Sequence, residues 1–382
     1  MKSNVLLFLF SFLFLTSCQE QKKNLCSSDS YLVEVSILSD IYRGIAEYLS
    51  LSKLVRLEDE PLVAPIKDIE IVDDRIIILD ITSRILCYDM EGKVQFVIDA
   101  KGNGPGEYAS VGFFSVDEEE RKIWIYDKSQ AILFGYSLIN GKFVEKRNQR
   151  KPMPFDIAYE NGMCYFDNPY HRNYREDVDL HYSLLSFRDR MTIEKRFFQH
   201  DEAEHEYNFI VSEKSFYRSN ELLYCKNFSK EVYALNGSDV SLRYEFVIPD
   251  WLGHEQIERK MDIGALLKSE YSYGLCDIFE CDDVLAFRFS KCGFIYSAMY
   301  DLKKNEQIYC SRIVQGQDGS RVPLINAIVG AYESQFVSVL SPEFLDYQKK
   351  KNPDMIESLI PNYNPDESNP IIAFYDVVRP ME

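Results

Sequence analysis

The sequence predicts an all-β protein, a six-bladed β-propeller preceded by an export signal. Three observations support this class. Short apolar runs separated by turn residues fill the chain from about residue 53 onward, and one strand pattern recurs six times. Aromatic residues that favour strands are abundant, with 26 Tyr and 25 Phe against 2 Trp. The length of 382 residues suits two domains or one repeat architecture.

Residues 1–17 are typical of a lipoprotein signal peptide. Lys2 supplies a positive charge, and Val5–Leu15 is a nearly unbroken apolar run. This run is too short to cross a hydrocarbon core of about 30 Å as a helix, so it fits a cleaved signal. The small residue Ser17 precedes Cys18, which we expect to be lipidated as the new N-terminus. The alternative is an ordinary signal peptide followed by a chance cysteine.

The next segment, residues 18–50, is predicted to be a lipidated tether. Its first part is polar and lacks hydrophobic periodicity, as flexible linkers do. The propeller is expected to occupy residues 51–382. The anchor would hold it at a membrane, since each buried methylene of an acyl chain contributes about 0.8 kcal/mol.

The repeated unit is clearest in its first copy. Ile66–Val72 is the first predicted strand and Arg75–Asp80 the second, with two aspartates between them. Ile85–Asp89 is the third strand and Lys93–Ile98 the fourth, joined by Glu91-Gly92. Tight polar turns between alternating strands predict hairpins, so this unit is one four-stranded blade.

The second strand of the unit marks each blade. Its copies end 40 to 62 residues apart, and the shorter intervals match the usual length of a propeller blade. The six copies are Arg75–Asp80, Lys122–Asp127, Met163–Asp167, Leu222–Lys226, Val284–Arg288 and Gln335–Leu340. A seven-bladed ring would need a further blade hidden in an insertion, so six blades are predicted.

The two ends of the chain complete the ring. The last blade supplies only Val322–Val329, Gln335–Leu340 and Ile371–Val377. An orphan strand, Lys53–Glu58, precedes the first blade. Pairing this strand into the last blade closes the ring and removes exposed sheet edges.

Three insertions interrupt the strands. His254–Glu270 carries apolar residues near one face and is predicted to be helical. Pro342–Leu359 is also predicted to be helical, with a break at Pro353 because proline lacks the amide that a helix interior needs. Pro169–Asp179 is charged and aromatic, and we expect a loop there.

Charge and cysteine content narrow the possible partners. The net charge of −18 argues against nucleic acid, whose phosphates need Lys and Arg, and favours a soluble, self-repelling surface. No cysteine pair has zinc-site spacing, since Cys276 and Cys281 lie too far apart and lack a matching second pair. No disulfide is predicted.

Several segments resemble a known family. They are the Ser17-Cys18 site, Val55–Glu58, the segment Lys101–Tyr108 (Lys-Gly-Asn-Gly-Pro-Gly-Glu-Tyr) and Asn369-Pro370 before the last strand. Together with the repeats, they resemble the six-bladed β-propeller lipoproteins of Bacteroidota, which are relatives of NHL-repeat propellers. The resemblance covers about residues 50–380 and implies the fold and an outer-membrane location, facing the periplasm or the cell surface. It implies no activity.

The glycine-rich part of this segment is not a nucleotide-binding loop. Phosphate loops lead into a helix N-terminus, whereas here Pro105 removes a donor and a strand follows. Glu107 and Tyr108 are candidate ligand-binding residues, because the loop joins two blades and would lie at the mouth of the channel. The alternative is a tight loop in which Glu107 accepts backbone hydrogen bonds.

No catalytic or metal-ligating residue is assigned. His200–Glu206 is rich in metal-type ligands, but its two histidines are five residues apart and a solvated acidic loop fits better. Asp80, Asp127 and Asp167 end three successive second strands and could form a ring of calcium ligands. Hydrogen bonds to the following turn are the favoured explanation.

Two functions follow from these observations. The first is a lipid-anchored binding module of the cell envelope, without a cofactor, that recognises a glycan, a peptide or an envelope protein. The second is a metal-dependent hydrolase or lyase of the NHL-like propeller type, with Ca²⁺ or Zn²⁺ at the channel. The binding module is favoured because the sequence contains no catalytic constellation, although fold alone establishes neither function.

Overall fold

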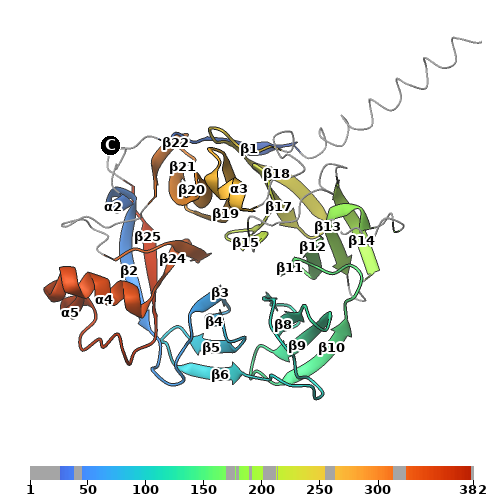
Figure 1. Cartoon of the computed structure of the whole chain (residues 1–382), viewed down its shortest axis with the longest axis horizontal. Helices are drawn as coiled ribbons and strands as arrows, with labels where there is room; N and C mark the ends of the chain where they lie inside the picture. The colour runs from blue at the N-terminus through green and yellow to red at the C-terminus, as the bar shows by residue number, and fades with distance from the viewer. Residues whose placement is uncertain are drawn as a thin grey trace, which may run out of the picture.

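The computed structural model describes residues 26–37, 45–168, 177, 180–188, 192–200, 212, 214–253, 263–312 and 324–379. Within this part of the chain, six separate sheets stand around a central axis as the blades of a ring (Figure 1). The prediction of a six-bladed β-propeller is confirmed. The signal peptide (1–17), Cys18, most of Pro169–Asp179 and most of His200–Glu206 lie outside the described residues.

Each blade has its first strand at the channel and its last strand at the rim. Blade 1 contains β3 (Ile66–Val72), β4 (Arg75–Asp80), β5 (Ile85–Asp89) and β6 (Val94–Ile98). Blade 2 contains β7 (Phe113–Asp117), β8 (Lys122–Asp127), β9 (Ile132–Ser137) and β10 (Phe143–Asn148). Blade 3 contains β11 (Asp156–Glu160), β12 (Met163–Asp167), β13 (Tyr182–Arg188) and β14 (Thr192–Gln199). Blade 4 contains β15 (Phe216–Arg218), β16 (Leu222–Cys225), β17 (Glu231–Asn236) and β18 (Asp239–Val247). Blade 5 contains β19 (Ser272–Cys281), β20 (Val284–Lys291), β21 (Phe294–Asp301) and β22 (Glu306–Ser311). Blade 6 contains β23 (Ile328–Tyr332), β24 (Gln335–Leu340) and β25 (Ile371–Val377).

Burial explains why the second strand is the strongest landmark in the sequence. Neighbouring blades cover both faces of β4, so Ile76 to Leu79 are all fully buried and read as a continuous apolar run. The outermost strand β10 shows the opposite pattern, with alternating exposed and half-buried residues. The apolar cores therefore lie between blades, and the rim carries most of the polar residues.

Tight turns connect the first and second strands. Two successive residues have positive φ in blades 1, 3, 5 and 6, as a two-residue type I′ hairpin requires. These pairs are Asp73-Asp74, Asn161-Gly162, Asp282-Asp283 and Glu333-Ser334. Asp and Asn tolerate this backbone better than most residues, which explains why they recur at these positions.

The ring is closed as the sequence predicts. Strand β2 (Leu49–Arg56) pairs antiparallel with β25 and becomes the outer strand of blade 6, with Leu54 opposite Ala373 and Val55 opposite Ile372. Val55 is buried between blades 6 and 1. The strand begins four residues earlier than the predicted segment, at Leu49.

The expected tether over residues 18–50 is wrong in its described part. Strand β1 (Cys26–Glu34) pairs parallel with β18 and gives blade 4 a fifth strand. Val33 is fully buried against the core that contains Tyr244 and Phe246. Only a few residues of this strand are apolar, and its pairing partner lies about 200 positions further along the chain, so no local pattern indicates it.

The residues directly after β1 contact blades 4 and 5. The backbone amide of Val35 donates to the carbonyl of Val247 over 2.9 Å, and the Gln307 side chain exchanges two hydrogen bonds with the backbone of Ser36. The short helix α2 (Ile45–Tyr48) precedes β2 directly. The described parts of residues 26–56 thus contact the rims of blades 4, 5 and 6, with β1 at the top and β2 at the left of the ring in Figure 1.

The helical insertions are confirmed in outline. Helices α4 (Pro342–Lys351) and α5 (Pro353–Leu359) meet at Asn352, so the break falls at the predicted proline. Within His254–Glu270, the described helix is α3 (Ile263–Lys268). The first strand of blade 6 was expected at Val322–Val329, but β23 begins only at Ile328, and the preceding described residues are irregular.

Candidate functional site

A funnel of about 1170 Å³ opens where the inner strands begin. All six blades contribute to its wall. The lining residues used below are Lys67, Asp68, Gly112, Phe113, Lys128, Phe155, Asp156, Lys214, Asp277, Arg288, Asn326, Ser341 and Glu343. Loops and strand ends at one face of a ring form a natural concave site, and this funnel has the volume of a ligand site.

The funnel differs from the chain as a whole in its charge. The chain is strongly acidic, at −18, whereas the funnel lining contains as many basic as acidic side chains. The basic ones are Lys67, Lys128, Lys214 and Arg288, and the acidic ones are Asp68, Asp156, Asp277 and Glu343. Such enrichment in cations within an acidic protein points to a specific role rather than to the average surface.

Ion pairs fix two of the basic residues. Lys214 Nζ lies 2.8 Å from Asp68 Oδ1 and so joins blades 4 and 1 across the funnel. Arg288 donates from two nitrogens to Asp277 within blade 5. Burial opposes the charge on Lys214, but Asp68 and Glu70 outweigh this effect and raise its pKa. Lys214 is therefore a fixed cation at the centre of the ring.

The other two lysines lie on the wall formed by blades 1 to 3. Lys67 Nζ donates to the carbonyl of Gly112 over 2.6 Å. Lys128 Nζ lies 5.2 Å from the ring centre of Phe113 and 4.7 Å from that of Phe155, which are cation–π distances. These rings and the backbone of Gly112 hold both ammonium groups at the funnel wall.

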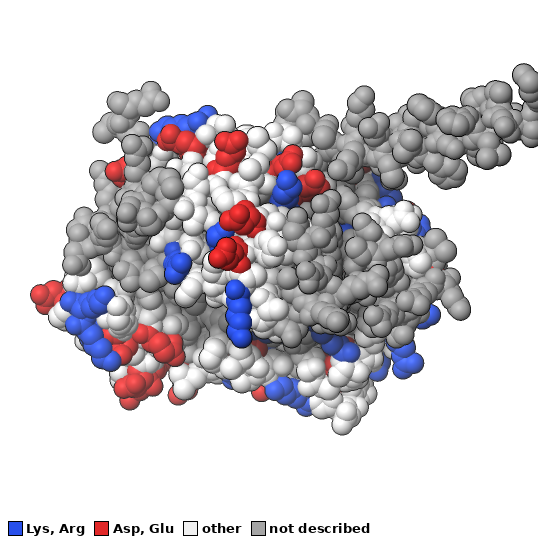
Figure 2. Space-filling model, turned by 45° about the horizontal axis from the view of Figure 1, so that its top comes forward, with Lys and Arg blue, Asp and Glu red and all other residues white. Residues whose placement is uncertain are grey.

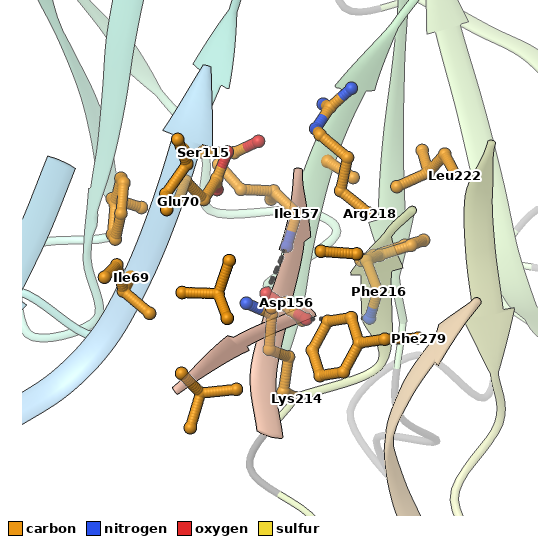
Figure 3. A pocket seen from close by; sticks show the side chains of 17 residues that line it. Ile69, Glu70, Ser115, Asp156, Ile157, Lys214, Phe216, Arg218, Leu222 and Phe279 are labelled. Carbon is orange, nitrogen blue, oxygen red and sulfur yellow. Dashed lines mark hydrogen bonds between the residues drawn. The ribbon is translucent and has the colours of Figure 1, made fainter. Parts of the chain in front are cut away.

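Below the funnel the channel narrows to a throat of about 40 Å³, where Glu70 and Ser115 face Arg218 (Figure 3). Arg218 donates to Glu160 Oε2 over 2.5 Å and to the carbonyl of Tyr159 over 2.6 Å. One carboxylate oxygen of Glu70 is buried without a hydrogen-bond partner in the described structure. The throat has room for only a few water molecules, so the channel is much narrower here than in the funnel.

Three carboxyl groups near the channel have raised pKa values. Burial raises the pKa of Glu70 to about 7, and Arg218 and Lys214 offset only part of this effect. Burial likewise raises the pKa of Asp156 to about 6 and that of Asp167 to about 7. Desolvation is the dominant cause in each case, because the charged form loses its hydration.

Asp156 and Asp167 join blades 3 and 4. Asp156 Oδ2 accepts hydrogen bonds from the backbone amides of Ser215 and Phe216, at 2.8 and 3.2 Å. Asp167 accepts from the hydroxyl groups of Ser215 and Tyr224, at 2.8 and 2.9 Å. Their polar atoms are thus engaged within the protein, and these groups serve the joint between blades.

The aspartates that end the other second strands bind their own turns, as favoured from the sequence. Asp80 Oδ1 accepts from the amide of Thr82 over 2.9 Å, and Asp127 Oδ1 accepts from that of Ser129 over 2.8 Å. Burial is the largest single effect and acts to raise the pKa of both carboxyls, but their hydrogen bonds together outweigh it and lower both pKa values. Asp167 differs, since its partners belong to blade 4.

The sequence-predicted ligand-binding residues Glu107 and Tyr108 do not line the funnel, so their expected place at the channel mouth is wrong. Tyr108 is fully buried, and its hydroxyl donates to the carbonyl of Ser83 over 2.8 Å. Glu107 accepts from the amide of Gly104 over 2.7 Å, which is the alternative foreseen for a tight loop. The loop packs over the outer strands of blade 2, because Tyr136 donates to the carbonyl of Gly106.

The sequence reasoning missed the funnel lysines. Lys67 is the second residue of an inner strand and Lys128 directly follows a second strand. Their shared signal is a basic residue at the funnel end of a strand in a strongly acidic chain. That signal becomes readable only when the strand ends are known to meet on one face.

The described residues contain no cluster of three or more His, Cys, Asp and Glu side chains suited to a metal ion. Of the acidic loop, only His200 is described, and its ring contacts the carbonyl of Asn168 over 3.0 Å. On the face seen in Figure 2, described acidic and basic side chains lie interspersed. No described helix is long and apolar enough to span a membrane.

The fold and the funnel define the class of protein: a six-bladed β-propeller with a charged central funnel. The chain belongs to the family described as "Domain of unknown function (DUF4934)", which matches residues 45–376. No curated protein matches the sequence.

One solved structure supports the fold over most of the chain. A Bacteroides fragilis protein described as exported superimposes with a TM-score of 0.71 at 18% identity, covering 92% of this chain and 99% of its own. A DUF4221 family member from Bacteroides vulgatus gives 0.49 at 11% identity, covering 87% and 99%. Virginiamycin B lyase of Staphylococcus aureus gives 0.41 at 14%, covering 75% and 81%. The last two scores are too low to support any argument about function.

Proposed function

We propose that this protein is a lipid-anchored recognition module of the cell envelope that binds its ligand in the funnel. The funnel itself is the observation on which this proposal depends. Its volume of about 1170 Å³ slightly exceeds the range of roughly 300–1,000 Å³ usual for small-molecule pockets. A ligand of several sugar or peptide units fits this size.

The narrow throat supports binding over transport. Glu70, Arg218 and the surrounding apolar side chains leave only about 40 Å³ below the funnel. A ligand therefore enters and leaves by the same mouth. The hydrogen bonds between blades keep this cup open without ligand, which reduces the entropy lost on binding.

The anchor is proposed at Cys18, with the protein in the outer membrane and facing the periplasm or the cell surface. The Ser17-Cys18 site after an apolar run supports lipidation, and the exported relative supports passage across the inner membrane. Labelled fatty acid should be incorporated into the wild-type chain and not into C18A. Labelling of C18A at the wild-type level would contradict the anchor.

Titration calorimetry with the purified lipoprotein in detergent tests the binding role. Oligosaccharides and peptides released from the cell envelope serve as probes. Asn326 is exposed at the funnel wall, so N326W should place a bulky ring inside the cup and abolish binding by obstructing it. Ile139 is 63% exposed in the hairpin at the opposite end of blade 2, so I139W is the matched control and should bind normally. Equal binding by both variants would contradict the proposal.

The alternative function is a metal-dependent hydrolase or lyase with Ca²⁺ or Zn²⁺ at the channel. Two funnel carboxylates that such an ion would use are already engaged, Asp68 by Lys214 and Asp156 by backbone amides. Elemental analysis of the purified protein decides between the two functions. One bound ion per chain that N326W loses would replace the binding proposal with the enzymatic one.

A further inference from the structure

Two lysines from different blades meet at one glycine of the funnel wall. Lys67 is on β3 in blade 1, and Lys128 follows β8 in blade 2. Both contact Gly112, which directly precedes β7. The ring therefore brings together two positive charges that are 61 positions apart in the sequence.

The geometry holds both ammonium groups in place. Lys67 Nζ donates to the carbonyls of Val111 and Gly112, at 3.4 and 2.6 Å. The stem of Lys128 packs on Gly112 so closely that a Cβ there would lie 2.8 Å from Lys128 Cγ. Glycine is thus needed for the approach of Lys128, whose ammonium group lies over two phenylalanine rings.

The electrostatics of this wall favour an anion. Lys67 is exposed and forms no ion pair with any described residue, although the chain carries 61 acidic side chains. The funnel carboxylate closest to it in sequence, Asp68, is paired with Lys214 instead. An oxyanion beside Lys67 would gain charge-assisted hydrogen bonds from its ammonium group, and the positive charge of Lys128 on the same wall would add to the attraction.

The rest of the funnel indicates what surrounds that anion. Phe155 is only partly buried and presents an apolar ring beside Lys128. The opposite wall offers the amide of Asn326, the hydroxyl of Ser341 and the Asp277–Arg288 pair. Amide, hydroxyl and charged planar groups hydrogen-bond sugar hydroxyls in both donor and acceptor roles.

We propose that the funnel binds an acidic saccharide whose carboxylate lies between Lys67 and Lys128. This inference rests on the proposed binding function and names the class of its ligand. One sugar ring packs against Phe155, and its hydroxyls face the polar wall of blades 5 and 6. The carboxylate of the saccharide pairs with Lys67, which has no carboxylate partner among the described residues.

Calorimetric titration of the lipoprotein in detergent tests this assignment. The probes are trigalacturonate, the neutral trisaccharide galactotriose, and a triglutamate peptide that matches the charge of the acidic sugar. The double variant K67Q/K128Q removes both charges while keeping side chains of similar polarity. The control is K146Q, because Lys146 is exposed on the rim strand β10.

Trigalacturonate should bind the wild type and K146Q alike, and K67Q/K128Q should weaken it about tenfold or more, as expected for lost hydrogen bonds to a charged group. Added salt should weaken binding to the wild type. Tighter binding of galactotriose or triglutamate, or no binding of trigalacturonate, would overturn the inference. Those results leave the funnel proposal standing as long as N326W still abolishes binding of the envelope-derived probes.

Discussion

At the scale of single residues, the channel is a place where burial and charge oppose each other. Glu70, Asp156 and Asp167 all have raised pKa values, yet two of them are needed to join blades 3 and 4. Hydrogen bonds from backbone and hydroxyl groups compensate part of the lost hydration of Asp156 and Asp167. Glu70 has one buried oxygen without such compensation.

The first prediction concerns the pH dependence of stability. The pKa of Glu70 is about 7 in the folded chain and 4.5 ordinarily, so the folded state binds more protons between these values. The free energy of unfolding should therefore fall as pH rises from about 4.5 to 7 and level off above 7. In E70Q this contribution is absent, so E70Q should exceed the wild type at pH 8 by about 1–3 kcal/mol.

Urea denaturation at pH 5 and pH 8 measures this difference. Glu145 is the matched control, because Arg147 and Lys122 outweigh burial and lower its pKa. E145Q should lose stability at pH 8 rather than gain it. A pH profile of E70Q that parallels the wild-type profile would show that Glu70 carries its charge without cost.

The second prediction concerns Tyr108, which supports the joint between blades 1 and 2. Y108F removes hydrogen bonds to the carbonyls of Ser83 and Ile98, at 2.8 and 3.2 Å. The cost should be about 1 kcal/mol of unfolding free energy, with ligand binding unchanged. Thermal unfolding and calorimetry of the same sample check both parts. If Y108F loses ligand binding but keeps normal stability, Tyr108 contacts the ligand and the prediction is wrong.

At the scale of elements, the N-terminal segment holds the ring together at two places. Strand β2 closes blade 6, and β1 covers the edge strand of blade 4. Asn369 strengthens the closure, because its side chain binds the amide of Val63 and the carbonyls of Glu58 and Pro61. This network explains physically why Val55–Glu58 and Asn369-Pro370 stand out in the sequence.

The third prediction tests whether β1 contributes to stability. The Val33 side chain is fully buried, at 0% exposure, whereas its neighbour Leu32 is 48% exposed. V33A should cost about 1–3 kcal/mol through lost burial and the cavity left behind. L32A deletes a larger side chain and should cost less than 0.5 kcal/mol, as surface substitutions do. If V33A and L32A lower the free energy of unfolding equally in chemical denaturation, residues 26–34 do not contribute to stability and act as a tether.

The sequence predicts elements well where both faces of a strand are buried. Arg75–Asp80 and Lys122–Asp127 are observed with the predicted bounds because blades on either side demand continuous apolar residues. Strand β1 escapes prediction because its parallel partner is remote and Val33 is its main buried contact. Lys67 and Lys128 escape for a related reason, since only the closed ring places them beside the same glycine.

At the scale of the whole molecule, the ring is a rigid frame around a single cup. Apolar cores between neighbouring blades fix the positions of the inner strands, and the funnel wall inherits that order. An envelope protein that meets its ligand outside the cytoplasm gains from such a preformed site, because little conformational entropy is lost on binding. In the proposed function, the anchor and the funnel act as separate parts of one recognition device.

Photo-crosslinking in living cells tests most directly whether the funnel is the binding site. A benzophenone amino acid replaces Asn326 at the funnel wall in one strain and Ile139 at the opposite end of blade 2 in another. We expect a discrete crosslinked product from position 326, reduced by K67Q/K128Q, and none from position 139. A product from position 139 with none from position 326 would contradict the assignment of the funnel as the binding site.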